Sequence, residues 1–248
     1  MPSTVIFGDV HGSAWQLKEL ITQARRRFGS DVEFYSLGDL VDRGPDSKGV
    51  LDICVAEGVK GILGNHELWL CSVLSGHAMN DMPYSKIMGG LTTLASYGLS
   101  RGDPDNVGPA IRRTIPKAHQ EWLLALPPYR FIEVAGVVYA LVHTGINAGT
   151  LTQIRAQVPE FPERSIPQLL VEQAPDMFFW TGPNPKSPEK VAKFESFVQV
   201  FGHTPNGKAL EVPGHFIALD TGCGTCPPFS LAAVVLHEDG KKDFISVH

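Results

Sequence analysis

Short apolar runs alternate with helical patterns through the first third of the chain. Runs rich in Val, Ile and Phe that end at Gly predict buried strands, and apolar residues recurring every three or four positions predict amphipathic helices. The predicted strands are 4–7, 32–37 and 60–63, and the predicted helices are 13–28, 47–57 and about 67–74. This alternation favours parallel strands joined by helical crossovers.

The chain changes character after the third predicted helix. Residues 76–116 are rich in Gly, Asp, Asn and Pro, and we expect a partly helical insertion there, with a helical piece near 86–97. A short helix over 117–126 follows. The second half is strand-rich, with predicted strands at 129–134, 137–142, 197–201, 215–219 and 231–236. Because no repeat or linker separates two cores, 1–248 is predicted to be one domain with a βαβ-like first half and an antiparallel second half.

Composition narrows the class of protein. Of 248 residues, 43% are hydrophobic and 19% are charged, which is ordinary for a folded domain and excludes wholesale disorder. The net charge of −5 disfavours binding to nucleic acid or to an anionic membrane. Apolar runs stay far below the roughly 20 residues of a membrane span, and no secretory signal is visible. With four cysteines, the predicted location is a reducing cytoplasm.

Five predicted strands end just before a side chain that can bind a metal. These strand ends are Gly8-Asp9, Gly38-Asp39, Gly64-Asn65, Val142-His143 and Gly202-His203. A single Gly-Asp after a strand is typical of a simple turn, but five such endings favour a shared site, because α/β sheets bind ligands beyond the carboxyl ends of their strands. His11 follows Asp9 by two positions, so a continued extended backbone would point both side chains the same way.

The chemistry of this set indicates metal ions. The predicted ligands are Asp9, His11, Asp39, Asn65, His143 and His203. They offer carboxylate, amide and imidazole atoms without a thiolate, which suits Mn, Fe or Zn better than Ca. Six ligands exceed the needs of one zinc and match two ions sharing a carboxylate. Two divalent cations beside two aspartates leave a positive site, which favours a phosphate.

At these residues the chain resembles a known family. Gly8-Asp9-Val10-His11-Gly12, Gly38-Asp39-Leu40-Val41-Asp42-Arg43-Gly44 and Gly64-Asn65-His66-Glu67 resemble the three signature blocks of the phosphoprotein phosphatases, which belong to the calcineurin-like metallophosphoesterases. His143-Thr144-Gly145-Ile146 and Gly202-His203-Thr204-Pro205 are similar to the two later histidine blocks. Gly89-Gly90 and the segment from Thr93 to Gly98 resemble the small bacterial serine/threonine phosphatases.

The resemblance implies an α/β (α+β) fold, a four-layer αββα sandwich of two mixed sheets flanked by helices. It implies two divalent metal ions, with Mn²⁺ expected and Fe or Zn as alternatives. Asp9, His11 and Asp39 would hold the first ion, and Asp39, Asn65, His143 and His203 the second, with Asp39 bridging.

The resemblance also assigns catalytic roles. Arg43 would bind phosphate oxygens together with Asn65 and His66, and His66 would be the general acid, oriented by Asp42. Hydrolysis would proceed by direct attack of a metal-bridging hydroxide, with no phosphoenzyme.

Three functions fit these features. The first is a metal-dependent phosphomonoesterase of the protein-serine/threonine phosphatase type, whose substrate is a phosphorylated protein or peptide, or a small phosphoester. The alternative is symmetrical hydrolysis of a dinucleoside polyphosphate such as diadenosine tetraphosphate. The third is a scaffold protein that binds metal without catalysis, although no ligand or acid is missing. The oligomeric state is not predicted.

The chain departs from the family at one position. Many relatives carry a second phosphate-binding arginine two residues after a mid-chain tryptophan, but here Gly182 follows Trp180 at that spacing, with Arg155 or Arg164 as alternatives. Cys223 and Cys226 are interpreted as structural loop cysteines. Asp220 is interpreted as a turn residue or as support for the ligands, and His119 as a surface residue.

Overall fold

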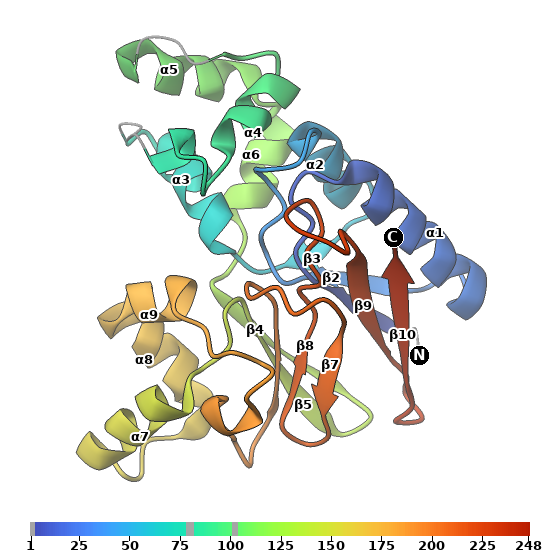
Figure 1. Cartoon of the computed structure of the whole chain (residues 1–248), viewed down its shortest axis with the longest axis vertical. Helices are drawn as coiled ribbons and strands as arrows, with labels where there is room; N and C mark the ends of the chain where they lie inside the picture. The colour runs from blue at the N-terminus through green and yellow to red at the C-terminus, as the bar shows by residue number, and fades with distance from the viewer. Residues whose placement is uncertain (1–2, 78–81, 101–103) are drawn as a thin grey trace.

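The computed structural model describes residues 3–77, 82–100 and 104–248, which form two five-stranded sheets with helices on their outer faces (Figure 1). The first sheet has the order β10-β9-β1-β2-β3. Its strands are β1 Thr4–Phe7, β2 Glu33–Ser36, β3 Lys60–Gly61, β9 Leu231–Leu236 and β10 Lys242–Val247. The second sheet has the order β4-β5-β6-β8-β7. Its strands are β4 Tyr129–Val134, β5 Val137–Val142, β6 Val198–Phe201, β7 Leu210–Val212 and β8 Phe216–Ala218.

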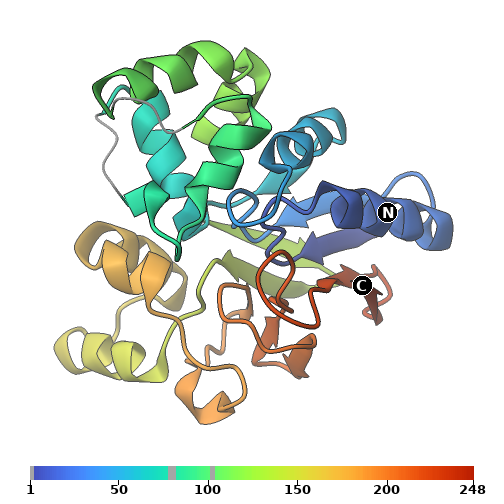
Figure 2. The ribbon, with the colours of Figure 1, turned by 45° about the horizontal axis from the view of Figure 1, so that its top comes forward.

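The helices form two groups, which Figure 2 shows on different sides of the sheets. The first group is α1 Ala14–Phe28, α2 Ser47–Ala56, α3 Asn65–Leu74, α4 Gly90–Ser96, α5 Pro104–Thr114 and α6 Lys117–Leu124. The second group is α7 Ala148–Gln157, α8 Ile166–Gln173 and α9 Pro175–Trp180. Among the described residues, no helix has both the length and the apolar character needed to cross a bilayer.

The β-α-β-α-β order of the first half is confirmed. β1 pairs with β2 and β2 with β3, all in parallel, while α1 and α2 make the crossovers. β9 and β10 come from the end of the chain and add to the open side of β1 in antiparallel fashion. The first sheet is therefore mixed, and its parallel part carries the loops of the predicted signature blocks.

The prediction of an antiparallel second half is wrong for the middle of the second sheet, although β9 and β10 pair in antiparallel fashion as expected. β5, β6 and β8 run parallel, and only the outer strands β4 and β7 are antiparallel to their neighbours. A parallel pair needs a long crossover, which α7–α9 supply between β5 and β6. These helices were not predicted because they are short and because α8 and α9 each carry a proline in the first turn, where it is tolerated in a helix.

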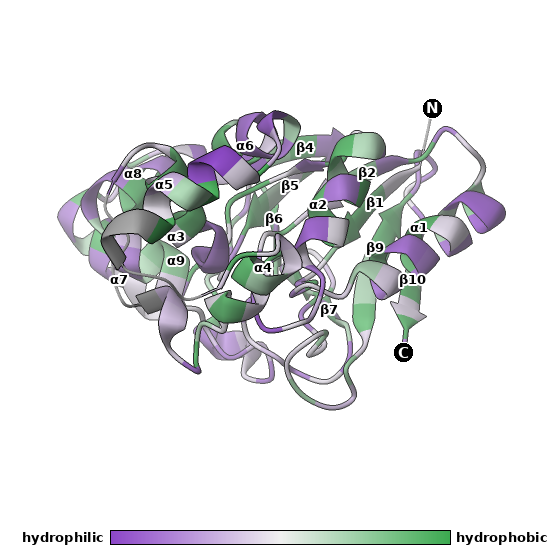
Figure 3. Ribbon diagram, turned by 90° about the horizontal axis from the view of Figure 1, so that it is seen from above, coloured by the Kyte–Doolittle hydropathy of each residue, from purple (hydrophilic) through white to green (hydrophobic). Residues whose placement is uncertain are grey.

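Three apolar clusters give the four layers. Ile6, Leu141 and Val200 belong to a cluster that contains residues from both sheets and fills the space between them. Val5 and Phe7 point the other way, toward the first group of helices, as the alternation of a strand requires. A third cluster joins the outer face of the second sheet to α7–α9. Figure 3 shows the strands as mostly hydrophobic and the outer helices as mixed. The predicted αββα arrangement with two mixed sheets is confirmed.

The predicted insertion contains more helix than expected. The helical piece expected near 86–97 is α4, and α5 follows it without having been predicted. Residues 78–81 and 101–103, which belong to the insertion, lie outside the described residues. His119 on α6 is buried, so its prediction as a surface residue is wrong. Its ring bonds to Tyr97 Oη (2.8 Å) and to the Asp52 carboxylate (3.0 Å), which ties the insertion to α2.

Candidate functional site

The loops after β1, β2, β3, β5 and β6 bring the predicted ligands to one place between the sheets. Asp9, His11, Asp39, Asn65 and His143 are all buried there. His203 is half-buried and completes the cluster. These side chains come from distant parts of the sequence, and the strand ends are what bring them together.

Four atoms of the set predicted for the second metal ion converge. His143 Nε2 and His203 Nδ1 each lie 2.9 Å from Asn65 Oδ1, and they are 3.2 Å from each other. Asp39 Oδ1 lies 3.3 Å from His143 Nε2. Asp39, His143 and His203 form one of two groups of His and Asp residues that could hold an ion.

The second group combines His11 and His66 with the same Asp39. His11 Nε2 is 3.5 Å and His66 Nε2 is 3.9 Å from Asp39 Oδ2. Asp39 thus has one carboxylate oxygen facing each group, which is the arrangement that a bridging ligand requires.

Asp9 lies beside the backbone of His203. Both of its carboxylate oxygens are 3.1 Å from the backbone nitrogen of His203. The backbone does not stay extended from Asp9 to His11, contrary to expectation, because His11 adopts a left-handed conformation with a φ of 43°. This conformation directs the His11 ring toward Asp39.

The histidine rings are oriented as metal ligands are. His11 donates from Nδ1 to the carbonyl of Val41 (3.0 Å), and His143 donates from Nδ1 to the carbonyl of Leu37 (2.8 Å). His203 bonds to the backbone of Trp180. Fixing one ring nitrogen in this way leaves the other as an acceptor that faces the centre. Imidazole nitrogens, Asn65 Oδ1 and Asp39 then face one another as acceptors, so a proton or a cation must lie among them.

The electrostatics of the cluster favour a cation. Burial raises the pKa of Asp9 well above its usual value, and repulsion from Asp220 and Asp39 adds to this effect. Burial disfavours a charged His143, but Asp39 outweighs burial and raises the pKa of His143 to about 10. At His203, burial outweighs the attraction of Asp39 and lowers the pKa to about 4. The carboxylates therefore attract positive charge, and these residues fit a divalent metal centre.

His66 and Asp42 form a buried pair next to this centre. His66 Nδ1 lies 2.9 Å from Asp42 Oδ2, which also accepts a hydrogen bond from Trp69 Nε1 at 2.9 Å. The other ring nitrogen of His66 faces Asp39. An imidazole held in this way has one nitrogen fixed by a carboxylate and the other directed toward the reacting groups, which suits proton transfer.

Arg43 places a guanidinium beside the cluster. Its Nη1 donates to His11 Nε2 (2.9 Å), and its Nε donates to the carbonyl of Ile87 (3.2 Å). The side chain is half-buried, so part of the guanidinium faces solvent beside the predicted ligands. A planar guanidinium in this place can bind two oxygens of a phosphate.

Backbone strain is concentrated at the site. His11, Asp39, Asp42, Arg43 and His203 all have positive φ values, between 43° and 72°. Non-glycine residues in this region cost about 1–3 kcal/mol each and persist only where the surroundings hold them. The loops are therefore built for the placement of these side chains and not for local stability.

Glu67 holds part of this strained backbone, a role that the sequence analysis did not assign. The fully buried carboxylate of Glu67 accepts hydrogen bonds from the backbone nitrogens of Gly64 (2.9 Å), Asp39 (2.8 Å) and Leu40 (2.8 Å). A signal was present, because glutamate three residues after a helix N-cap is typical of a capping box.

The place of the missing arginine is closed. A Cβ atom at Gly182 would lie 2.4 Å from the carbonyl oxygen of Thr144, so no larger residue fits without a shift of the backbone. Arg155, one of the two alternatives, bonds to Glu163 on the outer helices (2.7 Å), and Arg164 is exposed. Neither the contact of Arg155 nor the exposure of Arg164 supports a role for these arginines in the site.

The loop after β8 also packs against the site. Asp220 is buried, and burial raises its pKa to about 6. Its carboxylate accepts a hydrogen bond from the backbone of Gly222, as expected for a turn residue. Cys223 donates to Gln16 Oε1 (3.0 Å), and burial raises the pKa of the Cys223 thiol to about 12. Cys223 and Cys226 are both free, and a protonated, packed thiol at Cys223 fits a structural role.

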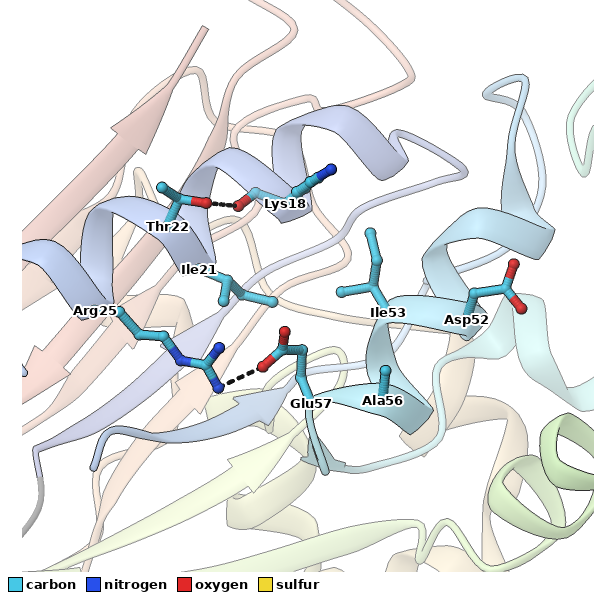
Figure 4. Close-up of a pocket in the computed structure, with 8 residues that line it drawn as sticks. All are labelled: Lys18, Ile21, Thr22, Arg25, Asp52, Ile53, Ala56 and Glu57. Atoms are coloured by element: carbon cyan, nitrogen blue, oxygen red, sulfur yellow. Dashed lines mark hydrogen bonds and ion pairs between the residues drawn. The ribbon is translucent and has the colours of Figure 1, made fainter. Parts of the chain in front are cut away.

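A surface pocket of about 510 Å³ lies between α1 and α2 (Figure 4). Ile21 and Ile53 face each other across it, and the ion pair of Arg25 with Glu57 closes one end. None of the predicted site residues lines it. This pocket is separate from the metal-binding cluster, and it does not supply a substrate site for it.

The chain was compared with known proteins. A family model for calcineurin-like phosphoesterases matches residues 2–207. Over 80 residues the chain is 41% identical to a symmetrical bis(5'-nucleosyl)-tetraphosphatase of Erwinia tasmaniensis and 42% identical to one of Pectobacterium carotovorum. These matches cover 32% of this chain and 29% and 28% of the relatives, so they span less than a third of either protein.

Solved structures show the same fold. A candidate diadenosine tetraphosphatase matches with a TM-score of 0.61 and 19% identity over 100% of this chain and 96% of that one. A protein serine/threonine phosphatase from Saccharomyces cerevisiae, similar to human phosphatase PP5, matches with a TM-score of 0.52 and 14% identity over 100% of this chain and 80% of that one. The family model covers most of the sequence, including all five signature blocks, and the chain therefore belongs to the calcineurin-like phosphoesterase family.

Proposed function

We propose that this member of a phosphoester hydrolase family is a phosphomonoesterase that acts on phosphoserine and phosphothreonine in proteins or peptides. The observation that carries the proposal is the buried Asp42–His66 pair beside the metal-binding cluster. A serine or threonine alkoxide is a poor leaving group, so its departure needs a positioned general acid. His66, with one nitrogen fixed by Asp42, is suited to that task.

Each part of the site has a separate task in this proposal. Asp9, His11, Asp39, Asn65, His143 and His203 would hold two divalent ions, for which we propose Mn²⁺. When bound, two such ions lower the pKa of water and neutralise charge on phosphate oxygens. Arg43 would bind the phosphate through its guanidinium and stabilise the charge that develops in the transition state. His66 would donate its proton to the leaving oxygen.

A second candidate is symmetrical hydrolysis of a dinucleoside tetraphosphate. It is favoured by the relatives of Erwinia and Pectobacterium, which carry that name and are about two-fifths identical to this chain over their shared 80 residues. In that reaction the leaving group is a phosphate oxygen, which is a weaker base than an alkoxide and depends less on His66. The two candidates therefore differ in how strongly they require the Asp42–His66 pair.

Parallel kinetics test the proposal. The Mn²⁺-loaded protein is assayed for kcat/KM on a phosphoserine peptide and on diadenosine tetraphosphate, and we expect the peptide to be preferred. His66→Asn should reduce turnover of the peptide by about 10²–10⁴-fold, whereas His237→Asn, on the remote β9–β10 hairpin, should have no effect. A strong preference for the dinucleotide would transfer the assignment to the second candidate. Failure to hydrolyse any of a broad phosphoester panel would contradict both.

A further inference from the structure

We propose that Thr93, on α4 of the insertion, is a positioning residue for the reaction, because its hydroxyl fixes the carboxylate that orients His66. Thr93 Oγ1 donates to Asp42 Oδ1 at 2.7 Å and accepts from the backbone nitrogen of Asp42 at 2.8 Å. Thr93 is fully buried, as is Asp42. This inference rests on the proposed role of His66 as general acid.

The contact decides how the Asp42 carboxylate is turned. With Oδ1 bonded to Thr93, Oδ2 is left for His66 and Trp69. Ser47 Oγ lies 2.9 Å from Thr93 Oγ1 and 3.1 Å from the backbone nitrogen of Asp42, so the threonine hydroxyl is itself held in place. Without the hydroxyl, Oδ1 would be a buried charged acceptor without a partner, and the carboxylate would turn to find one.

The residue just before α4 also contacts Arg43, the neighbour of Asp42. The backbone nitrogen of Arg43 donates to the carbonyl of Gly89, just before α4, at 3.2 Å. Gly89 has a φ of 71°, and a Cβ atom there would lie 3.0 Å from Arg43 Cα, so the close approach requires glycine. Asp42 and Arg43 are consecutive residues in the left-handed region; Thr93 in α4 holds the first, and Gly89, just before α4, holds the second. The insertion thus fixes the backbone that carries Asp42 and Arg43.

The test compares leaving groups. If His66 is misplaced, hydrolysis should slow for substrates whose leaving oxygen needs a proton and should stay unchanged for substrates with a good leaving group. Thr93→Val, which keeps the shape and removes the hydroxyl, should lose about 10–100-fold in kcat on a phosphoserine peptide but less than about threefold on 2,4-dinitrophenyl phosphate. Thr93→Ser, which keeps the hydroxyl, should stay within about threefold of the wild type on both. Thr93→Ala replaces the valine variant if that protein does not fold.

Ser96→Ala is the matched control. Ser96 Oγ donates to the carbonyl of Thr93 and accepts from the backbone of Lys48, so it attaches α4 to α2 without touching Asp42. It should lower the melting temperature and leave the ratio between the two substrates unchanged. A uniform loss on both substrates in Thr93→Val, or an equal loss in a folded Thr93→Ser, would show that the threonine is only structural and overturn the proposal.

A readout without turnover separates this proposal from the proposed function. The imidazole N–H resonances of His66 report its bond to Asp42, so they should shift in Thr93→Val and stay unchanged in Thr93→Ser and Ser96→Ala. If the wild type hydrolyses no phosphomonoester but the resonances shift as expected, the proposed function fails while the positioning contact stands. If turnover is present and the resonances do not move, the positioning contact fails alone.

Discussion

The loops after β1, β2 and β3 carry Asp9, His11, Asp39 and the Asp42–His66 pair, whereas the loops after β5 and β6 each contribute one histidine. Backbone strain occurs in both sets, at His11, Asp39 and Asp42 in the first and at His203 in the second. In the first set, Glu67 holds the backbone of Asp39, and Thr93 holds Asp42. His143 and His203 each fix one ring nitrogen on a backbone group, of Leu37 and of Trp180, and direct the other ring nitrogen toward Asn65. Under the proposed function, the first half would carry both metal binding and acid catalysis, whereas the second half would supply only metal ligands.

The largest expected effect comes from the residue shared by both groups. Asp39→Asn removes charge from an oxygen pair that faces His11, His66 and His143. The loss of a bridging carboxylate should cost several kcal/mol in the transition state, or about a thousandfold in kcat. The assay is turnover of p-nitrophenyl phosphate after metal stripping and Mn²⁺ reloading, with the exposed Asp31→Asn as the control. Full turnover by the reloaded Asp39→Asn protein would show that Asp39 does not link metal binding to catalysis in the first half.

A ligand of the second half should behave differently. His203→Ala takes away one imidazole but leaves Asn65 and His143 in contact. We expect Mn²⁺ affinity to fall by about 10–100-fold and activity to return when the metal concentration is raised to saturation. Isothermal titration with Mn²⁺ and activity at several metal concentrations measure both effects. If excess metal rescues Asp39→Asn but not His203→Ala, the contrast between the two halves is reversed.

The sequence predicts the first half of the chain more accurately than the second. In the first half, strong periodicity and the strand-end glycines predict β1, β2, α1 and α2 to within two residues of their observed bounds. Asp39, Asn65, His143 and His203 converge, and His11 and Asp9 lie beside Asp39 and His203, because the sheets bring the strand ends together.

The errors have physical causes that local sequence does not contain. Whether β5 and β6 pair in parallel depends on α7–α9, which are short, and two of which carry a proline in the first turn. The left-handed conformation of His11 depends on its bonds to the loop after β2. Thr93 is one residue in a helix, and its role appears only when α4 packs over Asp42.

The smallest expected effect tests whether the tight packing of the first half extends into the insertion. Burial lowers the pKa of His119, although Asp52 opposes this. The folded protein therefore takes up a proton at His119 less readily than the unfolded chain. The stability that His119 contributes is present above the pKa of the unfolded chain, near 6.5, and is lost as the pH falls through it. His119→Gln should cost about 1 kcal/mol at pH 7, because Tyr97 and Asp52 lose their partner, and the gap should narrow toward pH 5.

Urea unfolding of the metal-free wild type and His119→Gln at pH 5, 6 and 7 measures the difference in their free energies of unfolding. The metal-binding cluster titrates in the same way in both proteins, so its contribution cancels in this difference. The exposed His248→Gln, at the end of the chain, is the control and should show no gap at any pH. A gap that stays constant or widens on acidification would mean that the folded state accepts the proton as easily as the unfolded chain. The absence of any gap at pH 7 would mean that groups other than the Tyr97–His119–Asp52 contact hold the insertion, and tight packing would be confined to the loops around Asp42.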